Sequence, residues 1–330
     1  MIFFSLIIAI NILVYIFNRK IALKLNLYDY PDKLRKLHKS KVPLTGGIII
    51  LVNILFTLLF IIINNLVNND LIFFKTNLDL FIFTISTIVF FLVGYCDDKY
   101  NISATKRFLF ILLILIPIIY FSEDLLINHV RFSFTNNSFI FSQFFSIFWT
   151  ILCFLLFINA MNMFDGINYQ VAFYCVYLSL VFVLNQYFNI FFLNIIIGLI
   201  IFIVLNHKYE SFFGDSGSYL LAFIFSYLFI KMYNQTTNIT ADQIVLFMII
   251  PGIDLMRLFI TRIINGKPPF VADRNHIHHK LLLKSNLINT NLIIQSLIIF
   301  PSMLGYYFGS TIIFLVIQMM IYFYFVYFYN

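Results

Sequence analysis

The sequence predicts an all-α, polytopic integral membrane protein with about eleven transmembrane helices, an N-terminus outside and a C-terminus in the cytoplasm. Three observations support this fold class. Of the 330 residues, 62% are hydrophobic and only 11% are charged, whereas soluble proteins contain roughly 25% charged residues. Apolar runs long enough to cross a bilayer follow one another along the whole chain. Basic residues are concentrated in alternate loops, which is typical of a membrane protein with a defined orientation.

Each predicted span is an apolar run between polar residues. In chain order, the spans are expected near residues 1–17, 44–64, 80–96, 108–121, 142–158, 169–185, 187–205, 216–232, 243–263, 289–306 and 309–327. The first run has no basic n-region and no small-residue cleavage site, so we expect it to be retained as a span. The longest polar stretches are 18–43, 122–141 and 262–288. With no soluble domain and no internal repeat visible, residues 1–330 are expected to form one transmembrane domain.

The distribution of Lys and Arg predicts the orientation. Loop 18–43 carries eight basic residues, which places it in the cytoplasm by the positive-inside rule. If the spans alternate from there, 18 of the 21 basic residues fall in cytoplasmic loops or at cytoplasmic span ends, and only Lys75, Arg131 and Lys231 fall elsewhere. One missed span would invert every later loop, so this asymmetry supports both the number of spans and their direction. Most of the basic residues behind the net charge of +7 would then anchor the protein in the membrane, and the others could bind an anionic substrate.

The first polar motif, GYCDDK (94–99), ends the third apolar run. Its adjacent carboxylates, Asp97 and Asp98, repel each other and therefore favour a divalent cation beside them. A solvated helix end is the alternative. Lys106 and Arg107 follow one short loop later, as candidate phosphate ligands or as basic anchors at the membrane surface.

The second motif, NAMNMFDG (159–166), ends the fifth apolar run. Asn159, Asn162 and Asp165 recur every three residues, so on a helix they share one face. Two amides and an acid in an apolar segment need hydrogen-bonding partners. Such a cluster suits a nucleotide or metal-bound phosphates. The alternative is hydrogen bonding between helices, with a turn at Asp165-Gly166.

The third motif, FFGDSGS (212–218), opens the eighth apolar run. An Asp or Ser before a helix is an ordinary N-cap, and this is the preferred interpretation of Asp215 and Ser216 taken alone. A functional role for Asp215 depends on the other carboxylates reaching the same face of the membrane. Asn206 lies just upstream in the same predicted loop.

The fourth motif, PPFVADRNHIHHK (268–280), is the most specific feature of the chain. His276, His278 and His279 lie within four residues and are therefore candidate zinc ligands, but no cysteine accompanies them, and the nearby carboxylates suit Mg²⁺ better. The preferred interpretation is that the histidines and Arg274 donate hydrogen bonds to a diphosphate. A solvated loop is the alternative.

All four motifs fall on the predicted cytoplasmic side of the membrane. Carboxylates are costly in lipid and are usually retained for function. We therefore expect these acids and histidines to meet in one aqueous pocket around a metal ion and phosphates, as in an enzyme. The alternative is a cation- or proton-coupled transporter, but transporters place their coupling acids near the bilayer midplane, and these acids lie at span ends. An inactive scaffold would have no need to retain the acids.

Together the four motifs resemble the polyprenyl-phosphate N-acetylhexosamine-1-phosphate transferase family, glycosyltransferase family 4, which also contains phospho-N-acetylmuramoyl-pentapeptide transferase. The resemblance covers about residues 40–285 and includes the run Pro43-x-x-Gly46-Gly47. The sequence His-Ile-His-His-Lys at residues 276–280 is similar to the corresponding motif of the N-acetylhexosamine branch of this family. Members of this family have an eleven-span layout with their motifs on the cytoplasmic side, as expected here.

The resemblance implies an enzyme that transfers a sugar-1-phosphate, expected to be N-acetylhexosamine-1-phosphate, from a UDP-sugar to undecaprenyl or another polyprenyl phosphate, with release of UMP. It implies Mg²⁺ as cofactor, with Mn²⁺ as the alternative ion. The implied location is the bacterial cytoplasmic membrane, with the active site facing the cytoplasm. The product would begin a surface polysaccharide such as O-antigen, capsule or a cell-wall polymer. No nucleic-acid partner is implied, and a homodimer is left open.

The resemblance also implies roles for individual residues. Asp215 would be the main Mg²⁺ ligand with Asp97 beside it, and Asp98 would be the acidic catalyst, acting either as a base on the lipid phosphate or as a nucleophile. The implied substrate contacts are Asn162 and Asp165 with nucleotide or diphosphate, Asn206 near uridine, Lys106 with phosphate, His276, His278 and His279 with diphosphate, and Arg274 with sugar or phosphates.

One segment departs from the family pattern. Many relatives have Asp-Gly-x-Asp-Gly-Leu where this chain has Asp165-Gly166-Ile167-Asn168-Tyr169-Gln170. Asn168 can form hydrogen bonds but carries no charge, so it suits recognition of the base better than binding of a metal. Tyr169 and Gln170 indicate a divergent subgroup.

Overall fold

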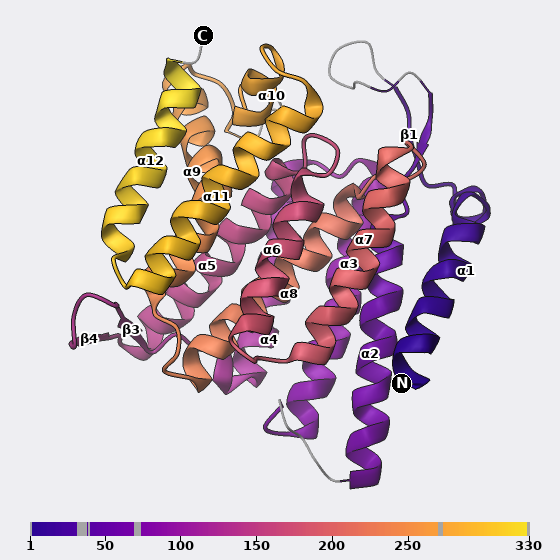
Figure 1. Ribbon diagram of the computed structural model, residues 1–330. Coiled ribbons are helices and arrows are strands. Elements are labelled where there is room, and N and C mark those ends of the chain that lie inside the picture. Colours follow the sequence, from indigo (N-terminus) through magenta and orange to yellow (C-terminus); the bar gives the residue numbers. More distant parts are fainter. Residues whose placement is uncertain (1, 32–37, 39, 69–73, 270–272, 329–330) are drawn as a thin grey trace. The chain divides into compact units, whose positions relative to one another are not determined.

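The computed structural model describes residues 2–31, 38, 40–68, 74–269 and 273–328 (Figure 1). Helices make up most of it. They are α1 (Ile2–Leu25), α2 (Gly46–Asn68), α3 (Asn77–Tyr100), α4 (Ala104–Phe121), α5 (Gln143–Phe164), α6 (Gln170–Leu184), α7 (Asn189–His207), α8 (Gly214–Gln235), α9 (Ala241–Ile264), α10 (Ile277–Leu282), α11 (Leu287–Phe308) and α12 (Thr311–Tyr327), with a 3₁₀ turn at Glu123–Leu125. Two antiparallel hairpins pair β1 (Tyr28–Asp29) with β2 (Val42–Pro43) and β3 (His129–Arg131) with β4 (Ser138–Ile140).

Every predicted span corresponds to a helix in the described part of the chain. Nine of these helices are long and apolar enough to cross a membrane, while α6 and α12 are shorter apolar helices. The prediction of a helical, polytopic membrane protein is therefore confirmed.

The helices extend beyond the apolar runs because capping residues, and not hydropathy, determine where they end. Helix α3 begins after Thr76, whose side chain accepts a hydrogen bond from the Asp79 amide at 3.1 Å, and it ends at Asn101 in the left-handed conformation. Helix α5 continues through Asn159 and Asn162, and Asp165 is its C-cap. The polar groups of the first two motifs therefore lie on the last turns of long helices.

The structure differs from the expected polar loop at 262–288, because that stretch contains the short helix α10. Ile277 and Leu281 lie four residues apart on one face of this helix, and both side chains are buried. Burial of this apolar pair stabilises a helical turn in the middle of the histidine motif.

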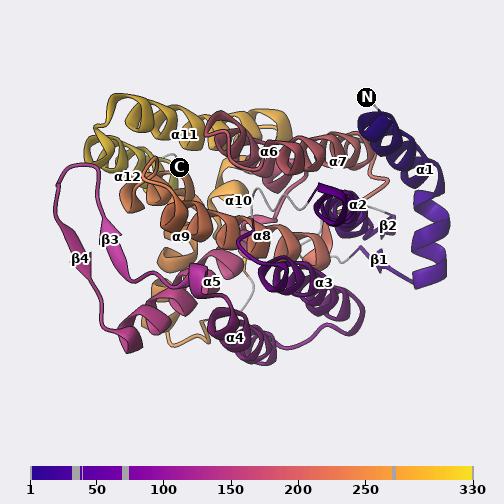
Figure 2. The same ribbon diagram turned by 90° about the horizontal axis from the view of Figure 1, so that it is seen from below.

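The helices group into two compact units. The first consists of residues 1–122 and 171–224, and the second of residues 123–170 and 225–330. In the first unit α2 packs against α1, α3 and α7, as Figure 2 shows, and α3 packs against α4. In the second unit α9 packs against α5, α11 and α12, and α10 packs against α11 and α12.

A buried amide network joins three helices of the first unit. The side chains of Asn53 in α2 and Asn11 in α1 exchange hydrogen bonds of 2.7 and 3.0 Å. The side-chain amide of Asn194 in α7 donates to the backbone carbonyl of Asn53 at 2.8 Å. A Cβ at Gly198 would lie 2.8 Å from the Asn53 amide nitrogen, so only glycine allows α7 to approach this closely. Such small residues and amide pairs are typical of helix contacts within membranes.

The β3–β4 hairpin is anchored at the end of the second unit where α9 begins. The backbone amide of Arg131 donates to the Tyr233 hydroxyl at 2.6 Å, and the Ser133 amide donates to the Asp242 carboxylate of α9 at 2.9 Å. The histidine motif follows the opposite end of α9, which places the candidate site residues of this unit away from the hairpin.

Candidate active site

Three carboxylates of the first unit gather where α3 ends and α8 begins. Asp97 and Asp98 lie in the last turn of α3, and Asp215 lies in the first turn of α8. The Asp98 carboxylate accepts hydrogen bonds from the backbone amides of Asp215, at 2.8 Å, and Ser216, at 3.0 Å. Asp98 therefore caps the N-terminus of α8 from a neighbouring helix, where backbone N–H groups have no partner within their own helix. The structure thus brings the first and third motifs together.

Arg107 is the basic residue that lies among these acids. Its Nη1 is 2.5 Å from Asp97 Oδ2 and 3.7 Å from Asp215 Oδ2. The other Asp97 oxygen accepts a hydrogen bond from the Ile102 amide at 2.8 Å, so this buried carboxylate is held on both sides. The Lys106 side chain, singled out from the sequence as a phosphate contact, is exposed. Successive side chains on a helix point about 100° apart, so the two neighbours cannot both face the acids.

The acidic cluster fits a hard divalent cation that is shared with a substrate. Among the described residues, no three His, Cys, Asp or Glu side chains form a group able to hold a metal by themselves. Mg²⁺ rarely needs such a group, because it keeps several waters and is usually bound by one or two carboxylates and substrate phosphates. Asp97 and Asp215, which both face Arg107, carry carboxylate oxygens of this kind. Gathered acids also favour additional positive charge.

Glycines allow α2 and α3 to touch the first turn of α8. A Cβ at Gly94 would lie 2.3 Å from the Asp215 carbonyl oxygen, and one at Gly47 would lie 2.6 Å from the Gly217 amide nitrogen. The Gly47 amide also donates to the Phe213 carbonyl at 3.1 Å. Gly47 and Gly94 therefore allow α2 and α3 to pack directly against the turn that carries Asp215. A side chain at either position would displace backbone atoms of the first turn of α8.

Asn206, predicted to lie near uridine, is buried at the end of α7. Its amide nitrogen donates to the Ser211 carbonyl at 2.9 Å, within the turn that leads to Asp215. The backbone carbonyl of Glu210, in the same turn, accepts a hydrogen bond from the side-chain amide of Asn18 in α1 at 2.7 Å. The amide of Asn206 thus helps to shape this turn, and its contact with uridine stays a prediction.

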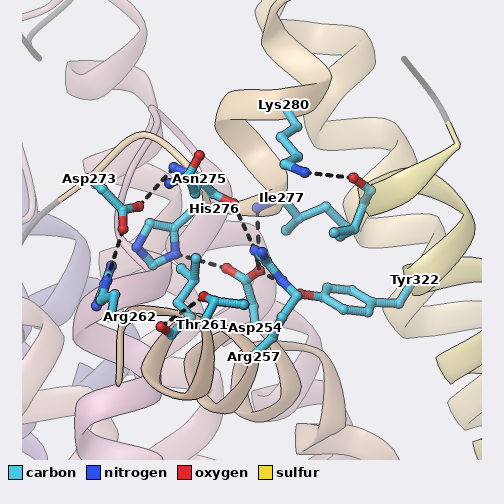
Figure 3. A network of polar contacts seen from close by, with 12 residues as sticks. Asp254, Arg257, Thr261, Arg262, Asp273, Asn275, His276, Ile277, Lys280 and Tyr322 are labelled. Carbon is cyan, nitrogen blue, oxygen red and sulfur yellow. Dashed lines mark hydrogen bonds and ion pairs between the residues drawn. The ribbon is translucent and has the colours of Figure 1, made fainter. Parts of the chain in front are cut away.

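In the second unit, α9 holds the histidine motif (Figure 3). His276 Nδ1 lies 2.8 Å from the buried carboxylate of Asp254. Arg262 donates to Asp273 at 2.8 Å, and the Asn275 amide donates to the other Asp273 oxygen, also at 2.8 Å. Sequence reasoning missed Asp254, although an acid within the ninth apolar run was a signal that could have identified it.

The second and fourth motifs meet within this unit. The buried imidazole of His278 lies directly against Gly166, since a Cβ on that glycine would be 2.0 Å from His278 Nε2. The following segment, which departs from the family pattern, is held by α11, because the Asn291 side chain donates to the Asn168 carbonyl at 3.0 Å. Tyr169 adopts a φ of +70°, a conformation that is uncommon for a residue other than glycine.

The remaining predicted contacts of this unit are accessible to different degrees. Arg274 is exposed, and four further side chains are partly exposed, those of His279, Asn162, Asp165 and Asn168. Together with the buried His276 and His278, these residues form two groups, an inner pair of histidines and an outer set that reaches the surface of the unit.

Two of the histidines are neutral at physiological pH. Burial, followed by the neighbouring imidazoles of His276 and His279, holds the pKa of His278 well below its usual range. Burial, followed by His276 and Arg274, lowers the pKa of His279 to about 4. A neutral imidazole has one N–H donor and one acceptor. Each ring can therefore donate at most one hydrogen bond to a phosphate.

Acid should destabilise the protein through these histidines. Unfolded histidines bind protons below their ordinary pKa of 6.5, whereas folded His279 does so only near pH 4. Between these values the unfolded state binds more protons, so stability is full above pH 6.5 and falls as the pH decreases. We expect the thermal midpoint in detergent to fall over this window, with a shallower decline in His279→Gln. His207→Gln, at an exposed position, is the control. Equal slopes in wild type and His279→Gln would contradict this assignment.

Comparison with known proteins shows which family the chain resembles. The model of glycosyl transferase family 4 matches residues 80–233, a stretch that contains Asp97, Asp98, Asp165 and Asp215. The chain is 28% identical over 278 residues to the undecaprenyl-phosphate alpha-N-acetylglucosaminyl 1-phosphate transferase of Escherichia coli (strain K12), a match covering 81% of this chain and 72% of the relative.

Two further relatives agree with this result. The protein of the same name from Salmonella typhi is 28% identical over 276 residues, covering 80% of this chain and 71% of the relative. The probable undecaprenyl-phosphate N-acetylglucosaminyl 1-phosphate transferase of Bacillus subtilis (strain 168) is 26% identical over 277 residues, covering 80% and 72%. None of these likenesses supports the transporter alternative. The chain is therefore similar to glycosyl transferase family 4 over residues 80–233, and to these transferases over about four-fifths of its length.

Proposed function

We propose that this chain transfers a sugar-1-phosphate, expected to be N-acetylhexosamine-1-phosphate, from a UDP-sugar to undecaprenyl or another polyprenyl phosphate. The observation that carries the proposal is the convergence of Asp97, Asp98 and Asp215 on Arg107 and the N-terminus of α8. The relatives, whose names state transfer to undecaprenyl phosphate, support the same reaction.

In this reaction, an oxygen of the lipid phosphate attacks the phosphorus that carries the sugar. The bond from that phosphorus to the bridging oxygen breaks, and UMP leaves with the electron pair. The product is a diphosphate that joins sugar and lipid. Such transfers depend mainly on positioning and on neutralisation of charge. In this one-step reaction, Asp98 would act as a base on the lipid phosphate. In the two-step alternative, the Asp98 carboxylate would attack the same phosphorus first and release UMP, and an oxygen of the lipid phosphate would then displace the carboxylate from that phosphorus.

Asp215 and Asp97 are the residues that would hold Mg²⁺, or Mn²⁺ in its place. A bound divalent ion would neutralise charge on the diphosphate of the donor. Arg107, whose guanidinium already contacts Asp97, would remain within reach of the phosphates as a second positive group. We also propose Lys106 and Asn206 as contacts of phosphate and uridine, respectively.

The residues of the second and fourth motifs are also part of this proposal, as contacts with the donor that the family resemblance implies. Neutral His279 and exposed Arg274 would donate hydrogen bonds to the phosphates or the sugar, and Asn162, Asp165 and Asn168 would contact the nucleotide. His276 and His278 belong to the same set, as the buried side of the motif.

We further propose that α6 and α12 also cross the bilayer, which gives eleven spans with the N-terminus outside and the C-terminus in the cytoplasm. This arrangement keeps the basic loops on the cytoplasmic side. The chain would then act as one transferase domain in the bacterial cytoplasmic membrane. Its product would begin a surface polysaccharide.

Release of UMP tests this function. Purified protein with Mg²⁺, undecaprenyl phosphate and each member of a panel of UDP-N-acetylhexosamines should release UMP with at least one donor, and EDTA should stop the reaction. Without the lipid phosphate, the amount of UMP should not exceed one molecule per protein molecule, because turnover requires an acceptor for the sugar-1-phosphate. No UMP above background with any donor would contradict the proposal.

A further inference from the structure

We propose that Asp254 is a positioning residue for the transfer reaction, which fixes the Nδ1–H tautomer and the orientation of His276, and that Tyr322 of α12 in turn fixes Asp254. The inference rests on the proposed function, in which the histidine motif contacts the donor. It assigns roles to a carboxylate within α9 and to a hydroxyl of the last helix, neither of which belongs to any of the four motifs.

Both oxygens of the Asp254 carboxylate take part in hydrogen bonds. One oxygen, Oδ1, accepts from the Tyr322 hydroxyl at 2.6 Å, from Arg257 Nη2 at 2.8 Å and from the Ile277 amide at 3.4 Å. The other oxygen, Oδ2, faces His276 Nδ1 at 2.8 Å. A carboxylate offers about four lone-pair positions. Four donors from α9, α10, α12 and the histidine motif therefore converge on this buried group, which suits it to holding its neighbours in place.

The contact with Asp254 decides the tautomer of His276. An ionised carboxylate only accepts hydrogen bonds, so the imidazole nitrogen that faces it must carry the proton. Asp254 has Arg257 beside it, which favours the ionised form. His276 Nδ1 is therefore the donor to Asp254, and the neutral ring presents Nε2 as an acceptor for a hydroxyl or N–H group of the substrate. A carboxylate that holds a catalytic histidine in one tautomer is a recurrent device in enzymes.

The orientation of the His276 ring also affects the position of His278, because the two rings stack. The rings of His276 and His278 are nearly parallel, at 4°, with centroids 5.2 Å apart. His278 in turn lies against Gly166 of the second motif. Movement of His276 would therefore disturb the stacked pair and its contact with the Asp165-Gly166 turn. Asp254 thus supports both motifs of this unit through the edge of the His276 ring.

Helix α9 also holds the backbone of the loop that carries His276. Arg257 Nη2 donates to the Asn275 carbonyl at 2.7 Å, and Arg262 Nη1 donates to the Pro269 carbonyl at 2.8 Å. The two arginines and Asp254 are spaced along one helix, so α9 acts as a rigid template for the loop. Sites on helices are held more precisely than sites that depend on loops alone.

Tyr322 connects the C-terminal helix to this arrangement. Its hydroxyl donates to Asp254 and accepts from Arg257 Nε at 2.7 Å, so one oxygen holds both members of the ion pair. The Tyr322 side chain is fully buried, and Figure 3 shows it reaching Asp254 from the side opposite His276. Helix α12 therefore contributes to the histidine site although it carries none of the four motifs.

Kinetics of four variants test the proposal. Asp254→Asn should lower kcat/KM for the UDP-sugar about 10- to 100-fold, the usual effect of losing a residue that orients a functional histidine. Tyr322→Phe, which removes a single hydroxyl, should lower it about tenfold. His276→Gln should lose at least as much as Asp254→Asn. The double variant Asp254→Asn/His276→Gln should be no worse than His276→Gln alone, because Asp254 acts through that ring.

Tyr324→Phe is the matched control, because it makes the same change two residues away on α12 at a side chain that is 55% exposed. It should retain wild-type kinetics. If Asp254→Asn does not give monodisperse protein, Tyr322→Phe carries the test. Wild-type kcat/KM in Tyr322→Phe, or losses that multiply in the double variant, would overturn the proposal.

A second measurement separates this inference from the reaction itself. In protein labelled with ¹⁵N-histidine at mildly alkaline pH, the resonances lost in His276→Gln should show protonated Nδ1 and unprotonated Nε2. Asp254→Asn should alter this pattern. A wild-type His276 protonated on Nε2 alone would overturn the positioning role. Absence of UMP release by the wild type would instead refute the proposed function, and the tautomer would still report on Asp254.

Discussion

Asp98→Asn is expected to remove UMP release, by about 10²- to 10⁴-fold, while the protein remains folded. Asparagine keeps the size of the side chain and one accepting oxygen, and it is as good an N-cap as aspartate. One of the two bonds from the Asp215 and Ser216 amides would survive, so the stability cost is about 1 kcal/mol. The negative charge that the proposed chemistry requires would be lost. Turnover and the thermal midpoint should be measured on the same preparation.

Glu210→Gln is the control for this variant. Glu210 is an acid of the turn preceding α8, and its partner Arg19 is 73% exposed, so the pair contributes little to stability. This control should retain its activity. Full activity in Asp98→Asn would show that the acidic pair has been assigned the wrong role, whatever the reaction.

Gly94→Ala should have the second large effect, since it adds one methyl group where two helices touch. That Cβ would lie 2.3 Å from the Asp215 carbonyl oxygen and 2.5 Å from the Ser216 Cα. These are backbone atoms of the first turn of α8, so the turn itself must move. Overpacking of this kind typically costs about 1–3 kcal/mol. We expect a lower thermal midpoint together with loss of UMP release, because Asp215 and the cap at Asp98 would be displaced.

Gly252→Ala makes the same substitution in the interior of α9, where a Cβ would meet no atom within 4 Å. Alanine favours a helix over glycine by up to about 1 kcal/mol, so this variant should be as stable as wild type or more so. If Gly94→Ala and Gly252→Ala behave alike, the close approach of α3 and α8 is not what holds the acidic cluster.

The fold could be predicted from hydropathy because each span must satisfy its backbone hydrogen bonds internally, which makes every long apolar run a helix. Helix ends were less predictable, since they depend on caps such as Thr76 and Asn101. Helix α10 was missed because six residues with two buried aliphatic side chains produce no recognisable periodic signal.

The acids of the site could be predicted, because a carboxylate at the end of an apolar run is rarely retained without a function. The sequence could not tell whether Lys106 or Arg107 faces these acids, because that depends on the rotation of α4 about its axis, which hydropathy does not determine. Asp254 and Tyr322 lie 68 residues apart. A single sequence contains no information that would pair them.

The histidines show a similar limit. From sequence they form one set of three equivalent donors to a diphosphate. The structure distinguishes them, because His276 is bonded to Asp254, His278 is buried against Gly166, and His279 is partly exposed. These differences arise from the packing of α9 and α10, which no spacing within the motif reveals.

The central claim is that the acids of the first unit and the histidines of the second face the cytoplasm. Labelling with a membrane-impermeant maleimide tests it most directly, with Cys96, Cys153 and Cys175 replaced by serine and single cysteines placed at the exposed positions Lys99, Arg274 and Asn136. We predict that Lys99→Cys and Arg274→Cys react only in inside-out vesicles, and Asn136→Cys only in right-side-out vesicles. Reaction of Lys99→Cys and Arg274→Cys from opposite sides of the membrane would contradict the claim.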